Sequence, residues 1–264
     1  MFIREHHQRT IDRLTALFQQ DKRFPALIIG GSIAKGIATD TSDVDFLLVA
    51  TDEEFARRQQ TQDLGYFDTS LCDYPGGYVD GKIINRQFIV DVAERGSEPA
   101  RWAFAGAIIA YSDIPDLADL IARAPVYQES EREGKMRSFL GQVILLAGYF
   151  AQEAEKRHDP YLMMQTTANL VLYAGRLILA YNRLLFPNMK RLMETLALAP
   201  EQPDGFLDIL QAALNAPSAT SAKAISTNIL QFREWDMTPL QASVQYMQDT
   251  EWRWRIDRPD LCDR

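Results

Sequence analysis

The fold is decided by Gly30-Gly31-Ser32-Ile33-Ala34-Lys35-Gly36 and, shortly after it, by Ser42-Asp43-Val44-Asp45-Phe46. The apolar run ALII at 26–29 leads into the glycines, and the run FLLV at 46–49 follows the aspartates. Short apolar runs bounded by glycine and polar residues are typical of buried strands. The sequence therefore predicts two strands that bracket a tight loop of the size of a phosphate group.

Asp43 and Asp45 form the acidic part of this stretch. Side chains alternate between the two faces of a strand, so both carboxylates project from one face and Val44 from the other. Two adjacent carboxylates repel each other unless a proton or a cation lies between them. Because hard oxygen ligands favour Mg²⁺ or Mn²⁺, we expect Asp43 and Asp45 to bind a divalent metal ion.

The glycine-rich part is typical of an anion-binding loop. Gly30 and Gly31 can adopt backbone angles that other residues avoid, which lets main-chain N–H groups approach a phosphate. We expect Ser32 to cap a short helix that begins near Ile33 and to add a hydroxyl donor. The positive N-terminal end of that helix would face the same anion. The loop and the metal ion would thus hold one polyphosphate.

Other glycine and aspartate motifs do not fit this spacing. A P-loop continues from its lysine with Ser or Thr, whereas Gly36 follows Lys35 here. The dinucleotide fingerprint G-x-G-x-x-G is absent, and Asp45 is followed by Phe46 rather than by the further ligand and glycine of a calcium loop. The remaining alternative is an ordinary strand-turn-strand segment with a solvated acidic edge.

The pattern Gly-Gly-Ser, a glycine four residues after the serine, and then Ser-Asp-x-Asp resembles the signature of the nucleotidyltransferase superfamily, which includes DNA polymerase beta and the aminoglycoside nucleotidyltransferases. The resemblance covers residues 27–49, and the helical remainder looks like the second domain of the antibiotic-modifying members. It implies that a hydroxyl group attacks the α-phosphate of a nucleoside triphosphate and that pyrophosphate leaves. Gly31 and Ser32 match the phosphate-binding pair of the family, and Asp43 and Asp45 match its metal ligands.

Members of this superfamily usually carry a third Asp or Glu on a later strand, and this chain offers Asp80 and Asp91. Asp80 lies in GGYVDGKIIN at 76–85, which reads as a hairpin segment. Asp91 lies in 88–93, where apolar residues at i, i+1, i+4 and i+5 predict a helix. We favour Asp80 as a metal ligand and catalytic residue, also because its interval from that helix resembles kanamycin nucleotidyltransferase. A simple turn at Asp80-Gly81 is the alternative.

Two lysines are candidates for contacts with the triphosphate. Lys35 lies directly beside the predicted phosphate loop. Lys190 follows a predicted helix break, and superfamily enzymes often use a lysine of the helical domain in this role. A flexible ammonium group suits contact with a phosphate. For both lysines, a solvated surface position is the alternative.

The composition limits the class of protein. With 264 residues, 47% of them hydrophobic, the chain can form two modest domains with cores. A formal charge of −8 argues against general binding of nucleic acids and suits a positively charged acceptor. Cys72 and Cys262 lack metal-type spacing, so we expect neither a disulfide nor a zinc site. Because no apolar stretch could span a membrane or resembles a signal peptide, we expect a cytoplasmic protein.

We predict an α+β fold, with a small mixed-sheet nucleotidyltransferase domain over 1–125 and an all-helical, acceptor-binding bundle over 126–264. In the first domain we expect helices at 5–21, 53–61 and 115–124 and strands at 26–31, 44–50, 66–72, 78–85 and 107–111. Pro125 marks the boundary between the two domains. Further prolines, such as Pro160 and Pro239, separate roughly five helices in the bundle.

Two further segments are open to more than one interpretation. His6 and His7 lie at the start of the first helix, where we expect them to be solvated rather than to bind metal. The segment EWRWR at 251–255 interleaves aromatic and cationic side chains. It forms either a platform for a base or sugar, or an anchor that fixes the last helix to the body of the protein.

The motifs and the resemblance together predict a nucleotidyltransferase that depends on Mg²⁺ or Mn²⁺. It would transfer a nucleoside monophosphate onto a hydroxyl group of a small molecule such as an aminoglycoside or a lincosamide. The expected donor is ATP, so that the transferred group is AMP. A protein or tRNA acceptor, as in antitoxin-type relatives, is the second hypothesis. A nucleotide-binding regulatory module without catalysis is the third. The sequence leaves the acceptor, the base and the oligomeric state open.

Overall fold

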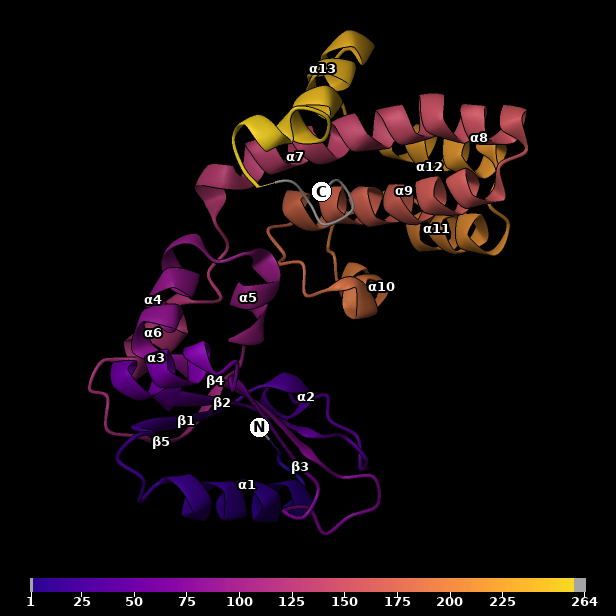
Figure 1. Cartoon of the computed structure of the whole chain (residues 1–264). Coiled ribbons are helices and arrows are strands. Elements are labelled where there is room, and N and C mark those ends of the chain that lie inside the picture. The colour runs from indigo at the N-terminus through magenta and orange to yellow at the C-terminus, as the bar shows by residue number, and fades with distance from the viewer. Residues whose placement is uncertain (1, 259–264) are drawn as a thin grey trace. The chain divides into compact units, whose positions relative to one another are not determined.

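The chain divides into two compact units, of which the first ends at Val126 and the second begins at Tyr127 (Figure 1). The computed structural model describes residues 2–258, so Cys262 lies outside the described residues. Unit 1 combines one sheet with helices and unit 2 is helical, which confirms the predicted α+β fold class. Within residues 2–258, none of the helices has both the length and the apolar character needed to cross a membrane.

Unit 1 is built on a five-stranded sheet with the strand order β3-β4-β2-β1-β5. The strands are β1 (Ala26–Ile29), β2 (Val44–Ala50), β3 (Gly65–Asp68), β4 (Val79–Asn85) and β5 (Ile108–Ser112). β2 and β4 run parallel, whereas the other neighbouring pairs are antiparallel. All five predicted strands are present in this mixed sheet.

Two strands end earlier than predicted, and each has a local reason. β1 stops at Ile29 because Gly31 takes a positive φ of 60° and begins the short helix α2 (Gly31–Ala34). β3 stops at Asp68 because its carboxylate accepts the backbone N–H of Ser70 at 2.6 Å. Aspartate commonly starts a turn in this way.

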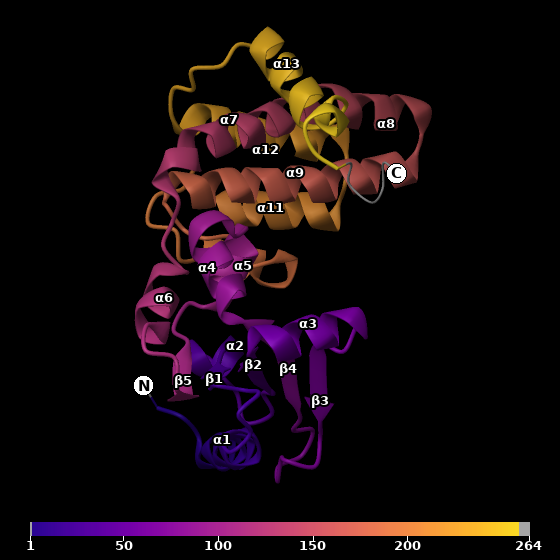
Figure 2. The same cartoon turned by 60° about the vertical axis from the view of Figure 1, so that its left-hand side comes forward.

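Helices cover both faces of the sheet (Figure 2). On one face, α1 (Glu5–Phe18) packs against the apolar side chains of a core that includes Val44 and Phe46 of β2. On the other face, α4 (Arg86–Arg95) and α6 (Leu117–Arg123) pack against a core that includes Val49. Side chains alternate along a strand, so Asp45 projects from the face that carries α4 and α6.

Two more helices complete unit 1. α3 (Asp52–Gln60) is capped by Thr51, whose hydroxyl accepts the N–H of Glu54 at 3.3 Å. α5 (Glu98–Ala103) begins after Ser97, which caps it in the same way. Serine and threonine are preferred at this position because they satisfy an otherwise unpaired N–H group.

Unit 2 is built around two long helical segments that lie side by side (Figure 1). The first consists of α7 (Glu129–Leu145), a π-helical turn, η1 (Leu146–Phe150), and α8 (Ala151–Arg157). The second is α9 (Pro160–Tyr181), which begins at the predicted break, where the Asp159 carboxylate caps it. The remaining elements are η2 (Met189–Arg191), α10 (Leu192–Leu196), α11 (Phe206–Asn215), α12 (Ala219–Phe232), α13 (Pro239–Asp249) and η3 (Arg253–Arg255). The described part of unit 2 thus holds more helices than the predicted five.

Candidate active site

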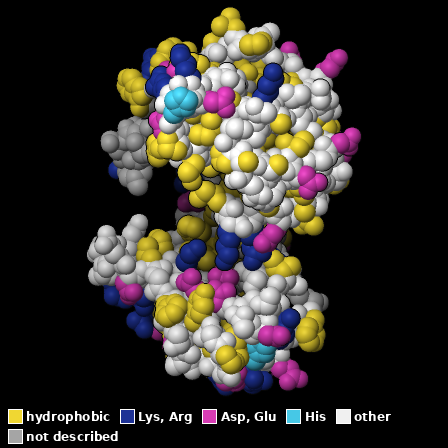
Figure 3. Space-filling view, turned by 90° about the vertical axis from the view of Figure 1, so that its right-hand side faces the viewer, with side chains coloured by type: hydrophobic (Ala, Val, Ile, Leu, Met, Phe, Trp, Pro, Cys, Tyr) yellow, Lys and Arg dark blue, Asp and Glu magenta, His cyan; other side chains and the backbone are white. Residues whose placement is uncertain are grey.

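Asp45 and Asp80 lie side by side near the beginnings of the parallel strands β2 and β4. The two residues are register partners, and register partners project from the same face of a sheet about 4.8 Å apart. Asp43 precedes β2 by one residue and is close enough to Asp45 to repel its charge. The structure therefore brings the three predicted carboxylates together on one face. Figure 3 shows acidic side chains gathered beside basic ones on one face of the chain.

The Asp45 carboxyl is the most perturbed of the three. Burial raises its pKa, and the neighbouring charges of Asp43 and Asp80 raise it further. The ammonium groups of Lys82 and Lys35 oppose this shift but do not reverse it. The fold therefore holds an acidic group where its ionised form is unfavourable, as expected of a position that receives a cation or a proton.

Gly31 lies directly against Asp45. A Cβ atom on Gly31 would lie 2.5 Å from Cγ of Asp45, closer than real Cβ atoms approach other atoms. The preceding Gly30 donates its N–H to the main-chain carbonyl of Asp45 at 2.9 Å. The glycine loop is thus fixed on the acidic strand, as the predicted shared site requires.

Ser32 does not cap a helix as predicted. The helix begins at Gly31, with Gly30 in the capping position, because the positive φ of Gly31 starts the turn before Ser32. The Ser32 hydroxyl oxygen is instead buried and has no hydrogen-bond partner among the described residues. Buried hydroxyl groups normally have a partner, and the first N–H groups of a helix also lack one within the helix. The loop therefore carries several hydrogen-bond donors that lack a partner among the described residues.

The two candidate lysines lie in different units. Lys35 directly follows α2, and its ammonium nitrogen lies 3.4 Å from the carbonyl oxygen of Gly31 and 4.0 Å from the ring centroid of Trp102. Lys35 is therefore half-buried and held beside the loop, and its contact with a triphosphate stays a prediction. Lys190 is exposed in η2 of unit 2, and its role stays a prediction.

The structure separates the two candidates for the third carboxylate. Asp91 lies within α4, as predicted, where it accepts hydrogen bonds from Gln87 at 3.2 Å and Arg95 at 3.0 Å. Asp80 lies inside β4, so a turn at Asp80-Gly81 is wrong. The residue beside Asp45 is Asp80, although its chemical role stays a prediction.

An aromatic pair next to the carboxylates was missed by the sequence analysis. The Asp43 carboxylate faces the Tyr78 hydroxyl and raises the pKa of Tyr78. The Tyr78 ring centroid lies 5.3 Å from that of Phe67, and Phe67 is the register partner of Asp80 on β3. Tyr78 precedes Asp80 by two residues, so strand alternation could have placed it on the same face.

The backbone just before Asp43 is held by α1 and by the loop after β3. The carbonyl oxygen of Ser42 accepts the Tyr74 hydroxyl at 2.8 Å and lies 3.0 Å from Nε2 of His7. His7 is buried, which lowers its pKa, so the expectation of a solvated side chain is wrong. These residues are far apart in sequence, and no local pattern indicates their contact.

The donor set fits a hard divalent cation that is shared with a phosphate ligand. Within residues 2–258, no three or more His, Cys, Asp or Glu side chains are arranged as a complete metal site. Mg²⁺ is usually bound by one or two carboxylates together with phosphate oxygens, rather than by a cage made of protein alone. Carboxylates beside an unpaired hydroxyl and a glycine that leaves no room for a Cβ atom match this second arrangement.

Comparison with known proteins shows a distant likeness in structure alone. No protein-family model matches the chain, and no curated protein matches it in sequence. Among solved structures, it is similar to a nucleotidyltransferase-like protein from Exiguobacterium sibiricum 255-15, with 12% identity and a TM-score of 0.49. The alignment covers 96% of this chain and 81% of that chain. So distant a likeness says nothing about activity or substrate, and the function rests on the residues of unit 1.

Proposed function

We propose that the chain is a metal-dependent nucleotidyltransferase whose active site lies in unit 1. The observation that carries this proposal is the register pairing of Asp45 with Asp80, together with the contact between Gly31 and Asp45. A carboxylate pair and a glycine loop with unpaired donors suit a polyphosphate and its metal ion. The resemblance of residues 30–45 to the superfamily signature points to the same chemistry.

In this proposal, some residues of the site bind the metal ion and the phosphates, and one residue acts on the acceptor. Asp43 and Asp45, joined by phosphate oxygens of the nucleotide, would hold a Mg²⁺ or Mn²⁺ ion, with Asp80 beside them as a proposed further ligand. The bound ion would neutralise the charge that develops on the triphosphate. Gly31 and Ser32 bind the β- and γ-phosphates through main-chain N–H groups and the hydroxyl. Asp80 also accepts the proton of the attacking hydroxyl group. Positioning and charge neutralisation supply most of the rate enhancement.

Three further residues contact the nucleotide in this proposal. Gly30 lets the main chain approach the phosphates, and Lys35 and Lys190 contribute positive charge to them. The donor is ATP, or else another nucleoside triphosphate. The acceptor is a hydroxyl-bearing small molecule such as an aminoglycoside or a lincosamide, selected by the helical residues 126–264, in a protein of the cytoplasm.

Pyrophosphate release tests the proposal. The full chain is incubated with ATP and Mg²⁺ in the presence of separate pools of small hydroxylated compounds, tRNA or protein. We expect release that depends on one pool and is lost in Asp43→Asn and Asp45→Asn. Asp119→Asn removes an exposed carboxylate of α6 outside the cluster and should leave the rate unchanged. An Asp45→Asn preparation that kept the full rate would contradict the assignment.

A nucleotide-binding module without catalysis is the second candidate. It is favoured by the finding that no complete group of three metal-ligating side chains exists among the described residues. ATP binding distinguishes it from the enzyme. If ATP binds in the presence of Mg²⁺ but no pool supports pyrophosphate release, the chain is a binding module.

A further inference from the structure

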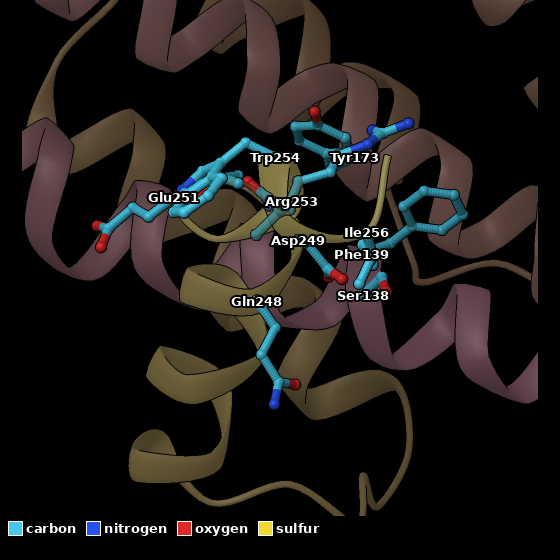
Figure 4. Close-up of a pocket in the computed structure, with 11 residues that line it drawn as sticks. Ser138, Phe139, Tyr173, Gln248, Asp249, Glu251, Arg253, Trp254 and Ile256 are labelled. Carbon is cyan, nitrogen blue, oxygen red and sulfur yellow. The ribbon is translucent and has the colours of Figure 1, made fainter. Parts of the chain in front are cut away.

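A cavity of about 700 Å³ lies within unit 2, remote in sequence from the carboxylates of unit 1 (Figure 4). Its walls come from α7, α9, the end of α13 and the turn that follows α13. The residues that matter here are Phe139, Gln142, Tyr173, Asp249, Trp254 and Ile256. Pockets that bind small molecules usually measure about 300–1,000 Å³, so this cavity has the volume of a ligand site.

One part of the lining is aromatic. The rings of Phe139 and Tyr173 are stacked, with centroids 6.1 Å apart and an angle of 26° between their planes. Trp254 lines the same cavity and is 64% exposed. A ring this exposed does not anchor the last helix, so the platform interpretation of residues 251–255 is the better one for Trp254. Aromatic faces of this kind bind flat rings.

A buried amide also lines the cavity. Gln142 of α7 is only 5% exposed and lines the cavity. An amide group can both donate and accept hydrogen bonds. Gln142 can therefore contribute a polar contact to a ligand in the cavity.

The charge at one end of the cavity is negative. Asp249 is the last residue of α13, where the helix already carries about half a negative charge. Its carboxylate accepts hydrogen bonds from the neutral amide of Gln245 at 3.1 Å and forms no ion pair with another described residue. Gln245 also donates a hydrogen bond to the Ser138 hydroxyl. Asp249 lies beside Ser138 in Figure 4.

Two other charged residues, Glu251 and Arg253, line the cavity. Glu251 points away from the rest of the group in Figure 4. The guanidinium of Arg253 forms an ion pair with Asp257 at 3.7 Å. The Asp249 carboxylate therefore remains available to a positively charged ligand.

We propose that this cavity binds a small organic cation that carries a flat ring. The ring lies against Tyr173 and Trp254, the protonated amine pairs with Asp249, and a polar group of the ligand bonds to Gln142. The site does not depend on the proposed transfer reaction, because the residues that form it all belong to unit 2.

Isothermal titration of the full chain with quinacrine tests the proposal. Quinacrine has a flat acridine ring and a protonated alkylamine, and 8-anilinonaphthalene-1-sulfonate serves as an aromatic probe of opposite charge. We expect saturable binding of one quinacrine per chain, and weaker binding of the sulfonate. Asp249→Asn should weaken quinacrine about fivefold through the lost ion pair, and Trp254→Ala about tenfold through lost stacking.

Matched variants separate this site from other acidic or aromatic surfaces. Glu133→Gln on α7 and Tyr161→Ala on α9 change exposed residues outside the cavity lining and should leave the affinity unchanged. Asp45→Asn should also leave it unchanged, since the unit 1 carboxylates are not involved. The proposal is overturned if quinacrine shows no saturable binding, if the sulfonate binds equally well, or if Asp249→Asn has no effect. A chain that binds quinacrine but transfers no nucleotide would contradict the proposed function alone.

Discussion

Gly31 and Asp45 are packed so closely that no carbon atom fits between them. A Cβ atom on Gly31 would lie 2.5 Å from Cγ and 2.6 Å from Cβ of Asp45. Gly31 also has a φ of 60°, which residues with a side chain rarely adopt. The position of the loop and the position of the carboxylate therefore depend on each other.

Gly31→Ala should disturb the site as well as the fold. Gly36 is a matched control, because its φ of 69° is similar but a Cβ atom there would meet nothing within 4 Å. We expect Gly36→Ala to lower the free energy of unfolding by about 1 kcal/mol through backbone strain alone. Gly31→Ala should lower it by more and should also abolish binding of ATP with Mg²⁺, measured by urea denaturation and calorimetry. Equal losses in both variants would show that the contact with Asp45 is unimportant.

Asp45→Asn should make the protein more stable while it removes activity. The raised pKa of Asp45 shows that its ionised form is disfavoured by burial and by Asp43 and Asp80. Without added divalent metal, a neutral amide removes this repulsion, and we expect the free energy of unfolding to rise by about 1 kcal/mol. The control Asp119→Asn should stay within about 0.5 kcal/mol of the natural chain. A destabilised Asp45→Asn would mean that the carboxylate has a structural role.

The sheet could largely be predicted from the sequence because its strands are short apolar runs between turn residues. β2 occupies the predicted range 44–50, and strand alternation placed Asp43 and Asp45 on one face. The pairing of Asp45 with Asp80 could not be derived in this way, because it depends on which strand lies parallel to β2. The choice of Asp80 rested on the resemblance to a family rather than on the residues alone.

Contacts between segments that are distant in sequence could not be predicted from the sequence. His7 and Tyr74 both bond to the Ser42 carbonyl, and only the tertiary fold brings α1 and this loop to the same atom. The start of α2 was also misplaced, since the sequence does not reveal that Gly31 has a positive φ. In unit 2 the prolines indicated helix starts correctly, as Pro160 and Pro239 show, because proline suits the first turn of a helix.

Glu54 should make unit 1 sensitive to acid. Its carboxylate bonds to Arg57 at 2.8 Å and to Arg58 at 2.7 Å, and these bonds lower its pKa from 4.5 to about 2. A group whose pKa is lowered by folding stabilises the folded chain above its unfolded pKa and ceases to do so as the pH falls through the folded value. We therefore expect the melting temperature to decrease as the pH is lowered from about 4.5 to about 2.

Glu54→Gln identifies this contribution. The variant should melt at a lower temperature than the natural chain at pH 7, and the difference should shrink toward pH 2, where Glu54 is protonated. Glu53→Gln is the control, because Glu53 lies on the same helix and is exposed. A Glu54→Gln curve parallel to that of the natural chain would show that other carboxylates account for the acid sensitivity. One such group is Asp73, which forms ion pairs with Arg9 and Arg13 at 2.9 Å.

Gly81→Ala should displace the strand that carries Asp80. Gly81 is the register partner of Phe46, and a Cβ atom on it would lie 2.5 Å from Cε1 of that ring. The absent side chain thus lets Phe46 pack across β4, and overpacking at such a contact costs about 1–3 kcal/mol. Gly65→Ala on β3, where a Cβ atom meets nothing within 4 Å, should cost nothing comparable in urea denaturation. Phe46→Leu combined with Gly81→Ala should recover part of the lost stability, because the smaller side chain leaves room for the added methyl group. If the double variant recovers no stability, the strain lies elsewhere.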